Sequence, residues 1–144
     1  MERLKFINMK TFALSLIILL SVVIPANISG QKSVNPQNSK ENVLILTDQN
    51  FDKTIKSGIV IVDFYATWCG PCKIFGPRLE EIALEMGKKV VACKLDTDKN
   101  HVTATKYSIR YLPTIILFKN GVPVKRYVGL QEKDTIVNAI NAIQ

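Results

Sequence analysis

The sequence predicts an α/β fold in which a mixed β-sheet lies between layers of helices. Over residues 43–107, apolar β-branched runs that are typical of buried strands alternate with segments of helical periodicity. An Asn120-Gly121 turn then joins two further apolar runs, which indicates an antiparallel hairpin, and an amphipathic segment ends the chain. Strand–helix alternation followed by a hairpin and a helix is typical of a mixed sheet covered on both faces.

The first strand and the first helix are expected to be short. An apolar run at residues 43–46 predicts the strand. Thr47 and Asp48 follow it as candidate N-terminal caps, because their side-chain oxygens can accept hydrogen bonds from free backbone N–H groups. The helix that they would cap ends before Gly58.

The second strand and the main helix contain the chain's most unusual residues. Residues 59–65 are apolar and β-branched except for Asp63, which predicts a strand buried on both faces with one acid inside it. A helix is expected from Cys72 to Gly87, kinked at Pro77 because proline removes a backbone donor. Its inward positions are predicted to be Ile74, Phe75, Leu79, Ile82, Ala83 and Met86.

The remaining elements complete the alternation. Residues 89–95 predict a third buried strand, and Val102–Tyr107 predicts a short helix. Residues 114–118 and 122–128 form the expected hairpin. The last helix spans residues 131–144, with inward positions at Ile136, Val137, Ile140 and Ile143.

Composition limits the possible classes of protein. The 144 residues are 47% hydrophobic and 22% charged, which suits one globular domain with a core and excludes disordered and collagen-like chains. The formal net charge is +7, but the basic residues are scattered and not interleaved with aromatic residues, so nucleic-acid binding is not expected. Three cysteines are too few for a small domain held together by disulfides.

The N-terminus predicts export. Basic residues up to Lys10 precede an uncharged stretch over residues 11–24, and about 14 helical residues would rise roughly 21 Å, less than a ~30 Å hydrocarbon core. Residues 1–30 are therefore predicted to be a signal peptide, and an uncleaved membrane anchor is the alternative. Residues 31–41 are a flexible lead-in, and residues 42–144 are the folded domain, placed in an exported, periplasmic compartment.

Trp68-Cys69-Gly70-Pro71-Cys72 lies between a buried strand and a helix. A thiolate at a helix N-terminus faces free N–H groups and the positive end of the helix dipole, so its pKa falls. Two intervening residues allow the second sulfur to reach the first. Cys69 is therefore the expected nucleophile and Cys72 the resolving cysteine; Gly70 permits a tight turn, and Pro71 makes it rigid.

This motif and four further segments resemble the thioredoxin family, and the resemblance covers residues 42–144. It implies the thioredoxin fold, with about five strands and four helices, and a thiol–disulfide oxidoreductase. No bound cofactor is expected, since the sulfur pair itself stores two electrons. The matching segments are Val62–Lys73, Lys94–Asp98, Ile109–Thr114, Phe118–Gly121 and Gly129.

The resemblance also assigns roles to residues outside the cysteine pair. Asp63 matches a buried acid that accepts a proton from Cys72, and Lys94 matches the lysine that pairs with that acid. Pro113 matches a cis-proline beside the sulfurs, with the Leu112 backbone offered to substrate. The residues assigned to substrate binding are Trp68, Gly70, Pro71, Leu112, Pro113 and Gly129.

The direction of the reaction has two interpretations. Gly70-Pro71 between the cysteines resembles reducing thioredoxins, so we predict a monomeric protein-disulfide reductase that acts on proteins with oxidised cysteines. Outside the cytosol its electrons must be resupplied, and a membrane thiol-electron transporter is the expected partner. The alternatives are a disulfide oxidase or isomerase in the same compartment and a non-catalytic peptide-binding module.

A structural zinc site is the alternative from a different class. Cys69, Cys72, Cys93 and His101 supply four possible ligands. Cys93 lies inside an apolar strand, however, and not on a second zinc knuckle, so no metal is expected. Cys93 is instead predicted to be an inert core thiol and His101 a solvated surface residue.

Overall fold

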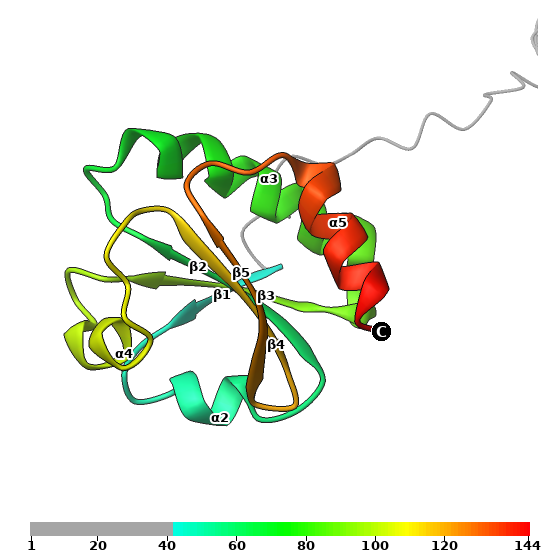
Figure 1. Cartoon of the computed structure of the whole chain (residues 1–144), viewed down its shortest axis with the longest axis horizontal. Helices are drawn as coiled ribbons and strands as arrows, with labels where there is room; N and C mark the ends of the chain where they lie inside the picture. The colour runs from blue at the N-terminus through cyan, green and yellow to red at the C-terminus, as the bar shows by residue number, and fades with distance from the viewer. Residues whose placement is uncertain (1–41) are drawn as a thin grey trace, which may run out of the picture. The chain divides into compact units, whose positions relative to one another are not determined.

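A computed structural model describes residues 42–144, so the predicted signal segment and lead-in lie outside the described residues. The sequence of elements alternates strands and helices up to β4 (Figure 1). The elements are β1 (Val43–Leu46), α2 (Phe51–Ile55), β2 (Ile59–Tyr65), α3 (Gly70–Met86), β3 (Val91–Asp96), α4 (His101–Lys106), β4 (Thr114–Lys119), β5 (Val122–Val128) and α5 (Lys133–Ala142). None of the helices within residues 42–144 has the length and apolar character needed to cross a membrane.

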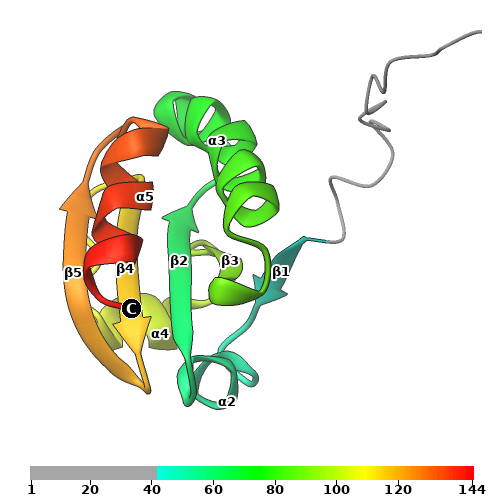
Figure 2. The same cartoon turned by 90° about the vertical axis from the view of Figure 1, so that its right-hand side faces the viewer.

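The strands form one five-stranded sheet in the order β1-β3-β2-β4-β5 (Figure 2). β1, β3 and β2 are parallel, whereas β4 and β5 are antiparallel to their neighbours. The Asn120-Gly121 turn joins β4 to β5, where both residues have positive φ, at 52° and 83°. The prediction of a mixed sheet with five strands and four helices is confirmed.

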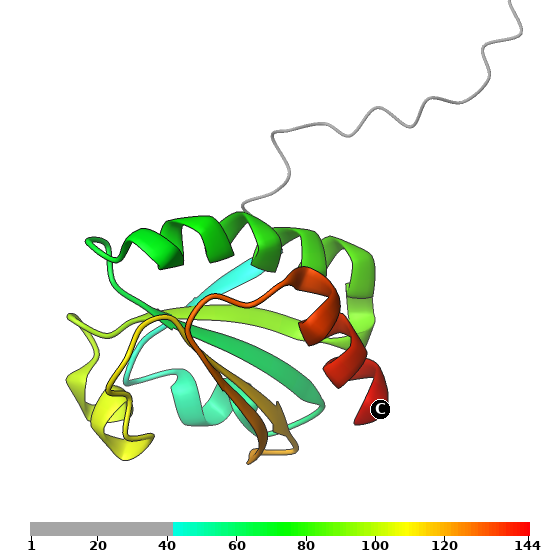
Figure 3. The ribbon, with the colours of Figure 1, turned by 45° about the horizontal axis from the view of Figure 1, so that its top comes forward.

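Helices cover both faces of the sheet: α3 and α5 lie on one face, and α2 and α4 lie on the other (Figure 3). Side chains of a strand alternate between faces. In β2, Ile61 therefore packs toward α3 and α5, while Val62 and Phe64 pack toward α2. The same alternation directs Asp63, between Val62 and Phe64, to the face that carries α3.

Two predictions about α3 are wrong. Ile74 is not an inward position, because its side chain is 52% exposed. The buried stripe runs through Phe75, Leu79 and Ile82 at helical spacing, and Ile74 lies about 100° away from Phe75 around the axis. The helix also begins at Gly70, two residues before the expected start, because Cys69 is its N-cap.

The predicted capping of α2 is also wrong. Its N-cap is Asn50. The Asp48 carboxylate instead accepts hydrogen bonds from the backbone N–H groups of Thr103 (2.8 Å) and Val102 (3.4 Å), in the first turn of α4. An acid that precedes one helix in the chain thus caps a different helix on the same face of the sheet.

An aromatic cluster on this face joins α2 to the sheet. Phe51 is 1% exposed, and its ring centroid lies 5.1 Å from Tyr107, 5.8 Å from Phe118 and 6.0 Å from Phe64. We expect Phe51→Ala to lower the free energy of unfolding by about 3–5 kcal/mol, because it removes buried surface and leaves a cavity. Urea denaturation measures this loss. Val102→Ala, at a side chain 71% exposed, is the control and should change stability by less than about 0.5 kcal/mol. An equal loss in both variants would contradict the prediction.

Candidate active site

The cysteine pair lies where the central strand β2 passes into α3. Cys69 and Cys72 form a disulfide with an S–S distance of 2.08 Å and a Cα–Cα distance of 5.3 Å. Cys69 has extended backbone as the N-cap of α3, and its Sγ accepts a hydrogen bond of 3.2 Å from the backbone N–H of Cys72. Pro71 occupies the first turn, where a missing N–H removes no helical hydrogen bond. In the dithiol form, the same N–H and the helix dipole would stabilise a thiolate on Cys69.

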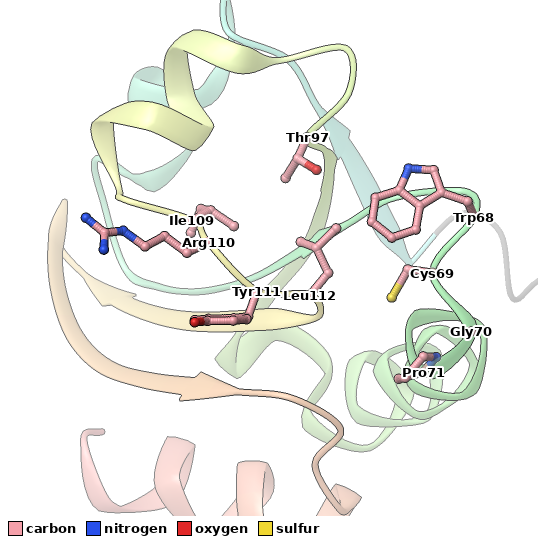
Figure 4. A pocket seen from close by; sticks show the side chains of 9 residues that line it. All are labelled: Trp68, Cys69, Gly70, Pro71, Thr97, Ile109, Arg110, Tyr111 and Leu112. Carbon is pink, nitrogen blue, oxygen red and sulfur yellow. The ribbon is translucent and has the colours of Figure 1, made fainter.

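A pocket of about 460 Å³ opens beside Cys69 (Figure 4). It brings together four of the residues predicted to bind substrate: Trp68, Gly70, Pro71 and Leu112. Its other lining residues are Cys69, Thr97, Ile109, Arg110 and Tyr111. The first cysteine of the pair is therefore reachable from a groove, and the groove is formed by three segments that are far apart in the sequence.

Pro113 and Gly129, the other two predicted substrate-binding residues, are not among the residues that line this pocket. The Leu112–Pro113 peptide bond is cis, and Pro113 is buried. The backbone N–H of Gly129 donates a hydrogen bond of 2.8 Å to the Pro113 carbonyl, with Gly129 in the left-handed region at φ 82°. This geometry ties the loop before β4 to the end of β5, and a contact of either residue with substrate stays a prediction.

The indole of Trp68 is held in place although it is exposed. Its side chain is 69% exposed, and Nε1 donates a hydrogen bond of 2.8 Å to Asp98 Oδ2. One wall of the pocket is thus an aromatic surface with a fixed orientation.

Asp63 lies behind the disulfide in a second cavity. The cavity has a volume of about 260 Å³, and Cys72 and Lys94 line it together with Asp63. Asp63 is 2% exposed, and its Oδ1 has no hydrogen-bond partner within residues 42–144. Burial raises the pKa of Asp63 to about 7, against an opposing effect of the Lys94 charge. A carboxyl with this pKa can both accept and release a proton at neutral pH.

Lys94 is adjacent to Asp63 but does not form a contact ion pair with it. The two residues are register partners on the parallel strands β2 and β3. Within the described part of the chain, no ion pair within 4.0 Å includes either residue. The Lys94 ammonium lies instead over the Tyr65 ring, 5.8 Å from its centroid. The predicted pairing is therefore an electrostatic effect across the cavity rather than a salt bridge.

The four candidate zinc ligands are not gathered. Cys69 and Cys72 are joined to each other, and Cys93 is fully buried among the aliphatic and aromatic side chains on the α2 face. Burial raises the pKa of the Cys93 thiol to about 12, which fits the predicted inert core thiol. His101 is exposed at the start of α4. Over residues 42–144, no group of three or more His, Cys, Asp or Glu side chains is placed to hold a metal ion.

Arg110, Tyr111 and Tyr65 are further residues of the site, beyond those predicted from the sequence. Arg110 and Tyr111 line the pocket, and Tyr65 lines the cavity of Asp63. Their positions in the sequence could have indicated a role in the site. Arg110 and Tyr111 come directly before Leu112-Pro113, and Tyr65 ends the strand that contains Asp63.

Comparisons with known proteins agree with this geometry. The Thioredoxin family model matches residues 42–142. A thioredoxin of Staphylococcus haemolyticus is 46% identical over 99 residues, covering 69% of this chain and 95% of its own length. A thioredoxin of Staphylococcus saprophyticus is 47% identical over 98 residues, covering 68% and 94%.

The solved structures give the same result. A mutant thioredoxin from Halobacterium salinarum superposes with a TM-score of 0.64 at 34% identity, covering 69% of this chain and 88% of that one. Thioredoxins act on disulfide-containing proteins. The chain therefore belongs to the thioredoxin family, and its Cys69–Cys72 pair makes it a thiol–disulfide oxidoreductase of the protein-disulfide reductase type.

Proposed function

We propose that the protein is a net reductant of protein disulfides in an exported compartment. The observation that carries the proposal is the active-site geometry: Cys69 caps α3, accepts the Cys72 N–H, and is reached from an open pocket. A thiolate stabilised in this position is a good attacking group. Both sulfurs belong to one chain, so we propose that a monomer is sufficient.

The proposed reaction has two exchange steps. The Cys69 thiolate attacks one sulfur of the substrate disulfide, a mixed disulfide forms, and the first substrate thiolate leaves. Cys72 then loses its proton to the Asp63 carboxylate and attacks the Cys69 sulfur, which releases the second substrate thiolate. Two electrons pass from the protein to the substrate, and the Cys69–Cys72 disulfide remains. The cavity shared by Cys72 and Asp63 supports the proton transfer, directly or through a water molecule.

The proposed compartment rests on the N-terminal sequence. Residues 1–30 combine a basic start with an apolar stretch and are proposed to be an export signal, or an anchor if they are retained. The family model begins at residue 42, after this segment. Because an exported reductase needs a source of electrons, we propose a membrane thiol-electron transporter as its reductant.

The direction of exchange is tested by equilibrating the protein with glutathione and measuring its reduction potential. We expect a value near the thioredoxin value of about −270 mV, because Gly70-Pro71 between the cysteines resembles reducing thioredoxins. About 30 mV corresponds to a tenfold change in the equilibrium constant. A potential near about −120 mV, typical of a strong disulfide donor, would favour the alternative of a disulfide oxidase.

The compartment is tested on the protein isolated from its own cells. Intact mass with and without thiol labelling reports whether residues 1–30 are present and whether Cys69 and Cys72 are reduced. We expect export, with the pair held as thiols. A full-length protein in the cytosol, kept reduced by soluble thioredoxin reductase and NADPH, would contradict both the export proposal and the membrane donor.

A further inference from the structure

We propose that Arg110 and Tyr111 form a specificity subsite that selects substrate segments carrying an acidic side chain near the reacting cysteine. The occupant is an extended acidic segment of an oxidised protein. This inference rests on the proposed function, because it concerns the choice of substrate at the same pocket.

The pocket extends beyond the sulfur. Figure 4 shows Trp68 and Cys69 on one side of Leu112, whereas the side chains of Arg110 and Tyr111 point away on the other side. All five residues line one pocket of about 460 Å³. A volume of this size is in the range that holds several side chains of a ligand. A substrate segment with its cysteine at Cys69 can therefore also reach the surface formed by Arg110 and Tyr111.

The surface formed by Arg110 and Tyr111 is positively charged. With Cys69 in the disulfide, Arg110 is the only charged side chain among the nine residues that line the pocket. The Asp98 carboxylate, which accepts the hydrogen bond from the Trp68 indole, does not line the pocket. An acidic side chain of a substrate would thus meet an attractive charge at Arg110, on the side of Leu112 away from the Cys69 thiolate.

Arg110 also differs from the other arginines of residues 42–144. Arg78 donates to the Gln131 carbonyl and pairs with Glu132 at 3.1 Å, and Arg126 donates to the Tyr107 carbonyl. Within the described residues, the Arg110 guanidinium has neither a hydrogen bond nor an ion pair. Its planar set of five donors, which matches a carboxylate in a bidentate geometry, is therefore free for a ligand.

Tyr111 supplies an apolar surface beside this charge. Its side chain is 70% exposed, and its backbone carbonyl accepts a hydrogen bond of 2.7 Å from the Thr114 hydroxyl. The ring is thus presented from a backbone that is already held in place. Tyrosine and arginine are enriched at binding hot spots because they offer large contact areas together with polar groups.

The test uses peptides with a single cysteine that is disulfide-linked to a coloured aromatic thiol. The peptides form matched sets in which one residue, at successive positions on either side of the cysteine, is Glu, Gln or Lys. The purified protein in its native processed form is first reduced. The rate of release of the coloured thiolate in this single turnover then gives a second-order rate constant for each peptide.

At one or more positions, we expect the Glu peptide to react about two- to fivefold faster than its Gln counterpart, and the Lys peptide to react more slowly. A single solvent-accessible ion pair accounts for a rate preference of this size, and the preference should decrease at high salt. Arg110→Gln should bring the ratio of the Glu rate to the Gln rate close to one. Tyr111→Ser should lower the rates of all peptides several-fold more than it lowers the rate of exchange with a small-molecule disulfide.

Lys125→Gln is the matched control. It removes the same charge from β5, at a residue that does not line the pocket, and should leave the preference for Glu intact. Equal preference for Glu, Gln and Lys in the unaltered protein would overturn the inference. A preference for Glu that persists in Arg110→Gln would also overturn it. So would a loss of the preference in Lys125→Gln equal to that in Arg110→Gln, because the preference would then depend on the overall charge of the protein.

Failure of the proposed function has a different signature. A protein whose potential is that of a strong oxidant would refute the proposed direction, yet the ratio of rates between peptides would still report the subsite. A protein that discriminates poorly but has a potential near that of thioredoxin would refute the subsite alone.

Discussion

Replacing Cys69 with serine is expected to reduce disulfide exchange to the uncatalysed rate, a loss of more than about 10⁴-fold. A serine hydroxyl is almost entirely protonated at neutral pH, and it cannot form the mixed disulfide on which the proposed exchange depends. The insulin-disulfide reduction assay, with a dithiol as electron source, measures this loss.

Cys72→Ser is the matched variant. It keeps the nucleophile and removes only the resolving sulfur, so the first exchange step should still occur. The mixed disulfide with substrate should then accumulate, and the mass of the protein should increase by that of the bound peptide thiol. If Cys69→Ser instead accumulated the adduct and Cys72→Ser did not, the two roles would be reversed.

The same pair of variants tests the peptide-binding alternative. A binding module would keep its cellular function in Cys69→Ser despite the loss of exchange. We expect that function to be lost together with exchange, because the open pocket leads to Cys69 itself.

Asp63→Asn is expected to stabilise the oxidised protein at pH 8, by roughly 2–4 kcal/mol, and to have little effect at pH 4. Burial raises the pKa of Asp63 from 3.8 to about 7, and a shift of this size corresponds to about 4 kcal/mol. At pH 8 the wild-type protein holds a buried carboxylate that forms no contact ion pair with any of residues 42–144, whereas asparagine is neutral at every pH.

The pH window follows from the direction of the shift. Because the folded protein binds the Asp63 proton more tightly than the unfolded chain, the contribution of Asp63 to stability is complete below about pH 4. It is lost as the pH rises to about 7. The difference between Asp63→Asn and the wild type should therefore grow between these two values and be constant above them.

Urea denaturation of the oxidised forms at several pH values measures this difference. Glu81→Gln removes an acid from the exposed face of α3 and is the control, for which no comparable rise is expected. A stabilisation by Asp63→Asn that is independent of pH would contradict the assignment to charge burial. The variant should also slow the release of substrate by Cys72, because the proton acceptor is gone, and a stabilised but fully active variant would refute the catalytic role.

Most of the fold could be predicted from local patterns in the sequence. Continuous β-branched runs identified β2 and β4, and Asn120-Gly121 identified the hairpin, since few other residues adopt the positive φ values that such a turn needs. Ile74 was misassigned because two adjacent apolar residues at a helix edge fit the pattern equally well. Only the position of the sheet decides that Phe75 is buried and Ile74 exposed.

The cysteine pair could also be predicted, since the disulfide, the N-cap and the turn proline lie within four consecutive residues. Asp48 shows the limit of such reasoning. Its position before α2 suggested a local cap, but its carboxylate binds N–H groups of α4 that are more than 50 residues away in the chain. A local pattern carries no information on which helix end the fold will bring beside a side chain.

The sequence by itself determined the strand–helix order, the redox pair and the family resemblance, because each depends on short local patterns and on their order along the chain. Only the tertiary structure decided how distant segments combine. In the folded chain, Trp68 lines the same pocket as Arg110 and Tyr111. The Lys94 ammonium lies over the Tyr65 ring and not in contact with Asp63. Burial and charge separation are properties of three-dimensional packing. They set the pKa of Asp63 and, within residues 42–144, leave Arg110 without a partner.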